Sequence, residues 1–190
     1  PIVFFDRKVE GIEASTVRID DYLMAFFMVE RMIRSGCRKI VHLAGPDHIS
    51  NGYDRHRGYR EALEKFSIPY DKRYVIKGGL SAEEGAAAVE KFMSQGLDFD
   101  GLFGFTETST LGAKSSLQKM NYRIPEDVSL CCISGTALCT LVHPTVTAVE
   151  QPVIEMATLS CRLLLGQIAD PNAAIENVML RGNIVERESF

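Results

Sequence analysis

The chain has no tryptophan, no long apolar run and no excess of positive charge. A membrane-spanning helix needs about 20 predominantly apolar residues in a row, and the longest apolar runs, such as residues 1–5, are far shorter. Proteins bind nucleic acid with basic groups that displace counterions from the phosphates, but here 21 basic residues are outnumbered by 25 acidic ones. We therefore predict no membrane span, and no DNA binding by this segment alone.

Signature motifs of enzymes and metal sites are also missing. The sequence has no G-x-S-x-G elbow, no Walker phosphate loop and no G-x-G-x-x-G, and its four histidines lie far apart without a nucleophile pattern. Cys132, Cys139 and His143 lack the spacing of a zinc site. We predict no catalytic residue, no metal and no cofactor, and an α/β enzyme is kept only as an alternative.

Cysteine is present but forms no disulfide pattern. The count of five is odd, and Cys131 and Cys132 are adjacent, so we expect buried thiols, no signal peptide and a reducing, cytoplasmic location. The 46% apolar and 24% charged residues are typical of a folded globular protein.

What the sequence does contain is an alternation of strand and helix patterns. Short apolar runs predict buried parallel strands at 2–6, 39–45, 73–77, 101–105 and 128–133, with further candidates at 16–20 and 177–188. Apolar residues at helical spacing predict five helices, whose apolar stripes begin at Phe26, Tyr59, Val89, Ala113 and Val153. This order implies right-handed crossovers and parallel sheets covered on both faces, which is a doubly wound α/β fold.

In such folds ligands bind at the carboxyl ends of the strands. The loop after strand 39–45 leads into a helix with Arg55, Arg57 and Arg60, which either donate into a cleft or form one solvated helical face. The loop after strand 101–105 carries Glu107 at a helix start, where a carboxylate is either a cap or a ligand acceptor.

Several stretches, in this order, resemble the effector-binding domain of the lactose-repressor (LacI/GalR) family of bacterial transcription regulators. They are PIVFFDR (1–7), VRID (17–20), SGCRKI (35–40), AGP (44–46), RHRGYREAL (55–63), LGA (111–113), IPEDVS (124–129), PTVTAVEQP (144–152) and ERES (186–189). The resemblance covers nearly the whole chain.

The resemblance implies two doubly wound lobes, like those of periplasmic sugar-binding proteins, with the effector between them. It assigns 1–20 to an incomplete N-terminal lobe, 21–149 to the C-terminal lobe, 150–175 to a return to the N-terminal lobe, and 176–190 to a final strand that crosses back. Family members also carry an N-terminal helix-turn-helix. We expect that head and the opening part of the first lobe to lie upstream of Pro1.

The resemblance also implies the residues of the effector site. Effector-binding roles fall on Arg55, Glu107, Asn51, Asp20, Gln151 and Leu80. Leu80 stands where relatives often have an aromatic ring, and 132–135 replaces the usual glycine, aromatic and paired acidic residues, so we do not expect a typical hexose or purine ligand. We predict that Arg55 and Glu107 form a polar clamp on the effector.

The function implied by the resemblance is the ligand-sensing and dimerisation domain of a DNA-binding regulator of the repressor type. It would bind a small polar, sugar-like effector, form a homodimer and contact a DNA operator through the N-terminal helix-turn-helix. The alternative is a free-standing periplasmic sugar-binding protein of a transport system.

Overall fold

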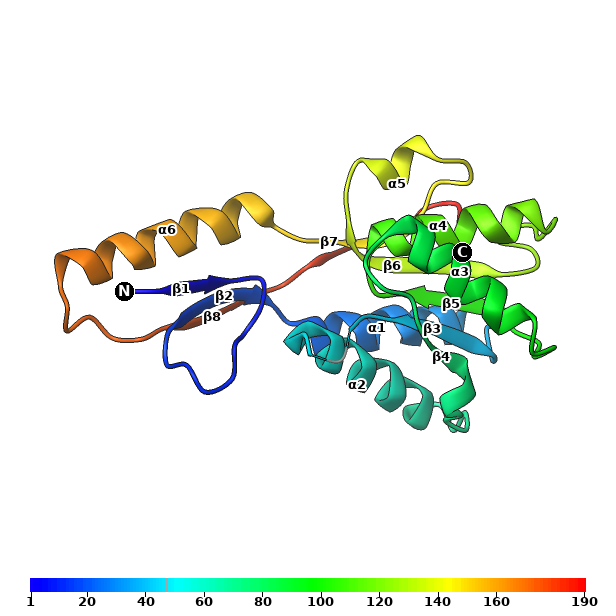
Figure 1. The fold of residues 1–190 in the computed structure, drawn as a ribbon, viewed down its shortest axis with the longest axis horizontal. Coiled ribbons are helices and arrows are strands. Elements are labelled where there is room, and N and C mark those ends of the chain that lie inside the picture. Colours follow the sequence, from blue (N-terminus) through cyan, green and yellow to red (C-terminus); the bar gives the residue numbers. More distant parts are fainter. Residues whose placement is uncertain (47) are drawn as a thin grey trace.

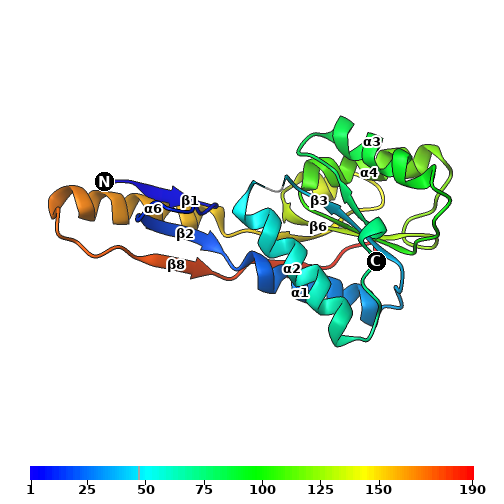
Figure 2. The same ribbon diagram turned by 60° about the horizontal axis from the view of Figure 1, so that its bottom comes forward.

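The computed structural model describes residues 1–46 and 48–190, which form two lobes (Figure 1). The first lobe holds a parallel three-stranded sheet of order β1–β2–β8, formed by β1 (Val3–Phe5), β2 (Ser15–Ile19) and β8 (Asn177–Leu180). Helix α6 (Val153–Ala169) lies along this sheet (Figures 1 and 2). The N-terminus belongs to this lobe and the C-terminus to the other.

The second lobe holds a sheet of order β4–β3–β5–β6–β7–β9 within the described residues. Its strands are β3 (Ile40–Ala44), β4 (Val75–Lys77), β5 (Gly101–Gly104), β6 (Ser129–Gly135), β7 (Thr147–Glu150) and β9 (Asn183–Val185). Strands β3 to β7 pair in parallel, whereas β9 runs antiparallel to β7. The lobe therefore has the doubly wound α/β architecture predicted from the sequence.

Helices cover both faces of this second sheet. They are α1 (Asp21–Arg34), α2 (Ser50–Lys65), α3 (Ala82–Met93), α4 (Glu107–Lys119) and the short α5 (Leu138–Leu141), with a 3-10 turn at Lys72–Tyr74. Helices α1 and α2 pack on one face, and α3 and α4 pack on the other. None of the helices in the described ranges is long and apolar enough to cross a bilayer.

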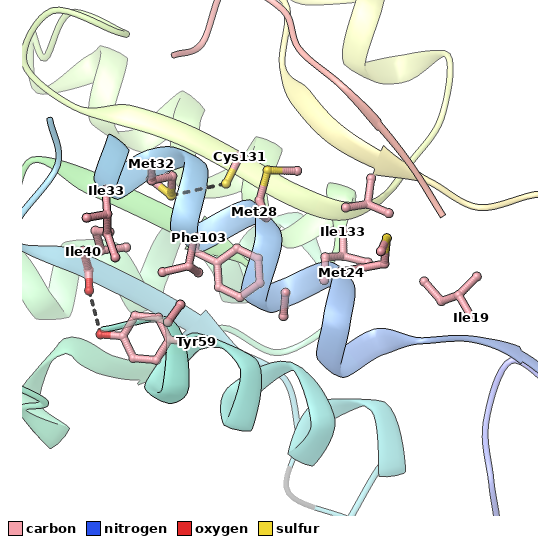
Figure 3. Packing of buried hydrophobic residues seen from close by; sticks show 14 of the residues in the cluster. Ile19, Met24, Met28, Met32, Ile33, Ile40, Tyr59, Phe103, Cys131 and Ile133 are labelled. Carbon is pink, nitrogen blue, oxygen red and sulfur yellow. Dashed lines mark hydrogen bonds between the residues drawn. The ribbon is translucent and has the colours of Figure 1, made fainter. Parts of the chain in front are cut away.

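Side-chain alternation along the central strands explains the two hydrophobic cores. Phe103 and Cys131 contact the α1 side, together with Tyr59 of α2 (Figure 3), whereas their neighbours Leu102 and Cys132 contact the α3 and α4 side. Successive strand residues point to opposite faces, so a strand buried on both faces must be apolar throughout. The short apolar runs of the sequence are these central strands.

The sheet of the first lobe departs from the expectation that both faces are covered. Val17 and Ile19 of β2 face the core beside α6. Thr16 and Arg18 line an open hollow on the other face, bordered by the β1–β2 loop and β8. Within the described residues, helix α6 covers one face of this sheet only.

The described chain passes between the lobes at three places: after β2 at Asp20, after β7 at Gln151, and between β8 and β9 at Arg181 and Gly182. The sequence places the third passage at residue 176. Strand β8 pairs with β2 before the chain leaves the first lobe, so the passage comes five residues later.

Candidate functional site

A buried ion pair lies where the first turns of α1 and α2 meet the exits of β5 and β6. Arg55 of α2 is 1% exposed and Asp21, the first residue of α1, is 0% exposed. Arg55 Nε donates to Asp21 Oδ1 over 2.7 Å, and Nη2 lies 2.6 Å from the same oxygen. Nη1 donates to the Phe105 carbonyl, and the guanidinium carbon lies 4.6 Å from the centroid of the Phe105 ring. These contacts hold the guanidinium through its Nε, Nη1 and Nη2 groups and through the Phe105 ring.

The ring beneath Arg55 depends on a glycine in the neighbouring loop. A Cβ atom added to Gly45, directly after β3, would lie 2.4 Å from the Phe105 ring. Carbon atoms do not approach so closely, so any side chain at this position would displace the ring. The absence of a side chain at Gly45 therefore allows the Phe105 ring to pack against Arg55.

Asp21 keeps unused acceptor capacity. Its Oδ2 is buried without a hydrogen-bond partner among the described residues. Burial raises the pKa of this carboxyl, and Arg55 offsets part of the increase, so that the pKa is about 6. An unsatisfied buried acceptor is costly, and a hydroxyl donor is the group that would satisfy it.

A second set of contacts joins Arg55 to the first lobe. Arg55 Nη2 and Gln151 Nε2 both donate to Ser134 Oγ, over 3.3 Å and 3.1 Å. Gln151 Nε2 also donates to Asp6 Oδ1 over 3.3 Å. We call Asp6, Gln151, Ser134 and Arg55 the inter-lobe chain, because it starts on β1's exit loop in the first lobe and ends on α2 in the second.

Glu107 is bound by the loop that follows β6. It is the first residue of α4 and 5% exposed. Its Oε1 accepts from the backbone N–H groups of Thr136 and Cys139 over 2.7 Å and 3.1 Å, and its Oε2 accepts from the Thr136 hydroxyl over 2.8 Å. Glu107 thus anchors the β6–α5 loop, while Arg55 is paired with Asp21. The clamp of Arg55 and Glu107 on a ligand stays a prediction.

The other predicted site residues differ in their burial and in their contacts. Asn51 lies one helical turn before Arg55 on the same face of α2, is 4% exposed, and has a buried Oδ1 with no partner in the part of the chain that the structure describes. Asp20 caps α1 by accepting from the Leu23 N–H over 2.9 Å. Leu80 is 41% exposed on the loop before α3.

Sequence reasoning missed Asp21, Ser134, Asp6 and Phe105. Asp21 precedes the buried Met24 and Met28 by three and seven positions, so helical periodicity places it on the buried face of α1. That signal was in the sequence. The contacts of Ser134 and Phe105 with Arg55 join segments far apart in the chain, and no local pattern indicates them. Residues 1–46 and 48–190 contain no cluster of metal-ligating side chains.

Two α/β lobes with a buried polar centre at their junction define a ligand-binding domain of the periplasmic-binding-protein type. The model of the periplasmic binding protein-like domain family matches residues 29–190, and the chain belongs to this family. The relatives that it matches are regulators of the LacI family, as the sequence resemblance predicts.

One such relative is the HTH-type transcriptional regulator CelR of Thermobifida fusca, which is 29% identical over 100% of this chain and 56% of its own length. Another is the ribose operon repressor of Halalkalibacterium halodurans, 27% identical over 88% of this chain and 50% of its own. The chain therefore spans about half the length of the curated relatives it matches.

Solved structures of transcriptional regulators are also similar to this chain. The transcriptional regulator CelR in complex with cellobiose superposes with a TM-score of 0.95 and 29% identity, covering 100% of this chain and 59% of that one. A LacI-family transcriptional regulator from Sanguibacter keddieii superposes with a TM-score of 0.90 and 26% identity, covering 100% and 71%.

Proposed function

We propose that this chain is the ligand-sensing domain of a bacterial DNA-binding transcriptional regulator of the repressor type. The observation that carries the proposal is the buried Arg55–Asp21 pair at the junction of the lobes, beside Asp21 Oδ2 and Asn51 Oδ1, two oxygens without a hydrogen-bond partner among the residues that the structure describes. The relatives named above are transcriptional regulators, which favours this role over that of a transport protein or an enzyme.

The ligand we propose is a small, neutral, polar molecule rich in hydroxyl groups. Asp21 Oδ2 and Asn51 Oδ1 can only accept hydrogen bonds, whereas Arg55 can only donate them. A hydroxyl group does both, so a sugar or related polyol satisfies both kinds of partner. The CelR structure contains cellobiose, which belongs to the same chemical class.

The mechanism we propose is a shift in population between two arrangements of the lobes. A ligand that contacts both lobes stabilises the arrangement it binds better, and it shifts the equilibrium by its difference in affinity. In the full-length protein, which we expect to be a homodimer in the cytoplasm, this change would alter the placement of two N-terminal helix-turn-helix heads on a DNA operator.

A binding screen tests the proposal. Thermal unfolding in the presence of cellobiose, ribose, other sugars, polyols, sugar phosphates and nucleosides should give a higher melting temperature with at least one hydroxyl-rich compound. A ligand at 100 times its Kd stabilises the native state by about 2.7 kcal/mol. Failure of every hydroxyl-rich compound to bind contradicts the proposal.

Two arginine variants on one helix localise the site. Arg55→Met should weaken binding of the compound found by at least tenfold, because it removes the planar donor group of the site. Arg60→Met is the matched control: Arg60 lies on the exposed face of α2, so its loss should leave the affinity unchanged. Equal affinities of both variants would place the ligand elsewhere.

A further inference from the structure

Ser134 holds a backbone conformation that serine rarely adopts. Its φ is +64°, near the end of β6, and in this left-handed region residues other than glycine, asparagine and aspartate are strained. Asp6, at the first-lobe end of the inter-lobe chain, has a φ of +66°. Strained residues persist where the surrounding structure fixes them, and they cluster at functional sites.

The Ser134 hydroxyl connects parts of the molecule that nothing local brings together. Its oxygen accepts from Arg55 of the second lobe and from Gln151 of a lobe passage. The Gln151 amide has two N–H groups, and Nε2 lies within hydrogen-bond distance of both Ser134 Oγ and Asp6 Oδ1. One serine oxygen therefore lies between the buried arginine and the first lobe.

We propose that Ser134 is a positioning residue that fixes the arrangement of the two lobes. Alanine or glycine at this position would remove the shared acceptor of Arg55 and Gln151, and the link from Arg55 to Asp6 would be broken. Backbone geometry alone favours glycine, so the function of the serine resides in its hydroxyl oxygen.

The link between Ser134 and ligand sensing rests on the proposed function, which places Arg55 in contact with the ligand. The Arg55–Ser134 hydrogen bond measures 3.3 Å to a neutral oxygen, whereas the contacts with the Asp21 carboxylate measure 2.6 Å and 2.7 Å. Longer hydrogen bonds to uncharged acceptors are weaker. A ligand oxygen that approaches Arg55 would therefore replace Ser134 first, which would detach Arg55 from the rest of the inter-lobe chain.

Distances between spin labels test the role of Ser134 without any ligand. Cys161, on α6 of the first lobe, is the exposed cysteine, and the other four are buried. Lys119, exposed at the end of α4, is replaced by cysteine to label the second lobe. Double electron–electron resonance then measures the distribution of distances between the lobes.

We expect one narrow distribution for the otherwise unchanged chain and a broader, shifted one for Ser134→Ala and Ser134→Gly. Ser129→Ala, at the opposite end of β6, is the matched control and should leave the distribution unchanged. Gln151→Leu should broaden it to the same extent as Ser134→Ala, and the double variant should add nothing further, because both residues act through one chain of contacts.

The proposal is overturned if both Ser134 variants keep the narrow distribution, or if the effects of Ser134→Ala and Gln151→Leu add. Ser134→Gly keeps the test decisive if Ser134→Ala unfolds, because glycine adopts this backbone conformation without strain. If no compound binds in the sugar screen, the proposed function is contradicted, but the role of Ser134 in the lobe arrangement is not. If the spin-label distances do not change in the Ser134 variants, the role of Ser134 is contradicted, but the proposed function is not.

Discussion

Arg55 and Asp21 place two opposite charges out of contact with water. Desolvation consumes most of the attraction in such a pair, yet the loss of one partner leaves the other charge buried and uncompensated, which costs about 3–5 kcal/mol. Asp21 can escape this cost by binding a proton, because burial already raises its pKa to about 6. The stability of variants at this pair should therefore depend on pH.

We expect Arg55→Met to lower the free energy of unfolding by about 3–5 kcal/mol at pH 8 and by clearly less at pH 5. Without Arg55 the pKa of Asp21 rises further above its unfolded value of 3.8. The folded state then binds more protons than the unfolded chain, so stability decreases as the pH rises through this range. Urea unfolding followed by circular dichroism measures the difference.

The double variant Asp21→Asn with Arg55→Met serves as the control for this pH effect. It has no carboxyl group to titrate at this position, so the difference between pH 5 and pH 8 should become smaller than that of the unchanged chain, in which Asp21 titrates near pH 6. An equal loss of stability at both pH values in Arg55→Met alone would contradict the assignment of the raised pKa to Asp21.

Single residues of the site were partly predictable. Arg55 and Gln151 were identified from motifs that resemble a known family, and the structure joins them through Ser134. The partners Asp21 and Phe105 meet Arg55 from separate elements. Such contacts depend on how helices and strands pack, which one sequence does not specify locally.

At the scale of elements, the contact between α1 and α2 depends on Gly58. A Cβ atom at this position would lie 2.4 Å from the Tyr22 carbonyl oxygen and 2.8 Å from the Phe26 nitrogen. Both are backbone atoms, which cannot rotate away as a side chain can. The two helices can approach this closely only because α2 has no side chain at the crossing.

We expect Gly58→Ala to lower the free energy of unfolding by more than about 2 kcal/mol, because overpacking forces the backbone apart. Gly166→Ala is the matched control on α6, where an added Cβ meets nothing within 4 Å. There alanine should stabilise the helix by about 0.5–1 kcal/mol. Thermal unfolding compares the two, and a neutral Gly58→Ala would disprove the close crossing.

The long helices and most strands were predicted, whereas strand β7 and helix α5 were not. The apolar stripes gave all five long helices, and the predicted strands are present. Strand β7 contains only two apolar residues, Ala148 and Val149, and helix α5 is a single turn, so neither shows an apolar run or a helical stripe. The extended stretch 177–188 is divided between two sheets, because a change of pairing partner leaves no periodic signal.

At the scale of the molecule, polar contacts near the start of α2 tie it to the first lobe. Arg18 of β2 donates to Asp54 over 3.2 Å, and the Lys8 N–H donates to the Ser50 hydroxyl over 3.0 Å. The Arg18 and Asp54 side chains are each 21% exposed. Ion pairs near the surface contribute up to about 1 kcal/mol, so these contacts orient the lobes more than they stabilise them.

We expect Arg18→Ala to enlarge the radius of gyration measured by small-angle X-ray scattering while changing the free energy of unfolding by less than about 1 kcal/mol. Arg34→Ala removes an ion pair with Glu30 inside the second lobe and should leave the radius unchanged. If Arg18→Ala and Arg34→Ala scatter identically, the Arg18–Asp54 pair has no part in the lobe arrangement.

The two-lobed arrangement itself came from the family resemblance, since strand and helix patterns do not reveal which strands share a sheet. Alternation alone is equally compatible with one continuous sheet. The structure separates β1, β2 and β8 from the other strands. Which strand belongs to which sheet is set by the three passages of the chain between the lobes. These passages bring together segments that lie far apart in the sequence, so no local pattern indicates them.

Ser189 ties the tail of the described chain into the second lobe. It is fully buried, its hydroxyl donates to the Leu130 carbonyl, and that hydroxyl accepts from the Thr147 N–H over 2.9 Å. The second lobe begins at Asp21, yet this closure follows β8 of the first lobe in the sequence. Contiguous domains fold one after another during synthesis on the ribosome. Here β8 of the first lobe and β9 of the second lobe follow each other directly in the sequence, so a ribosome paused before residue 177 would hold both lobes unfinished.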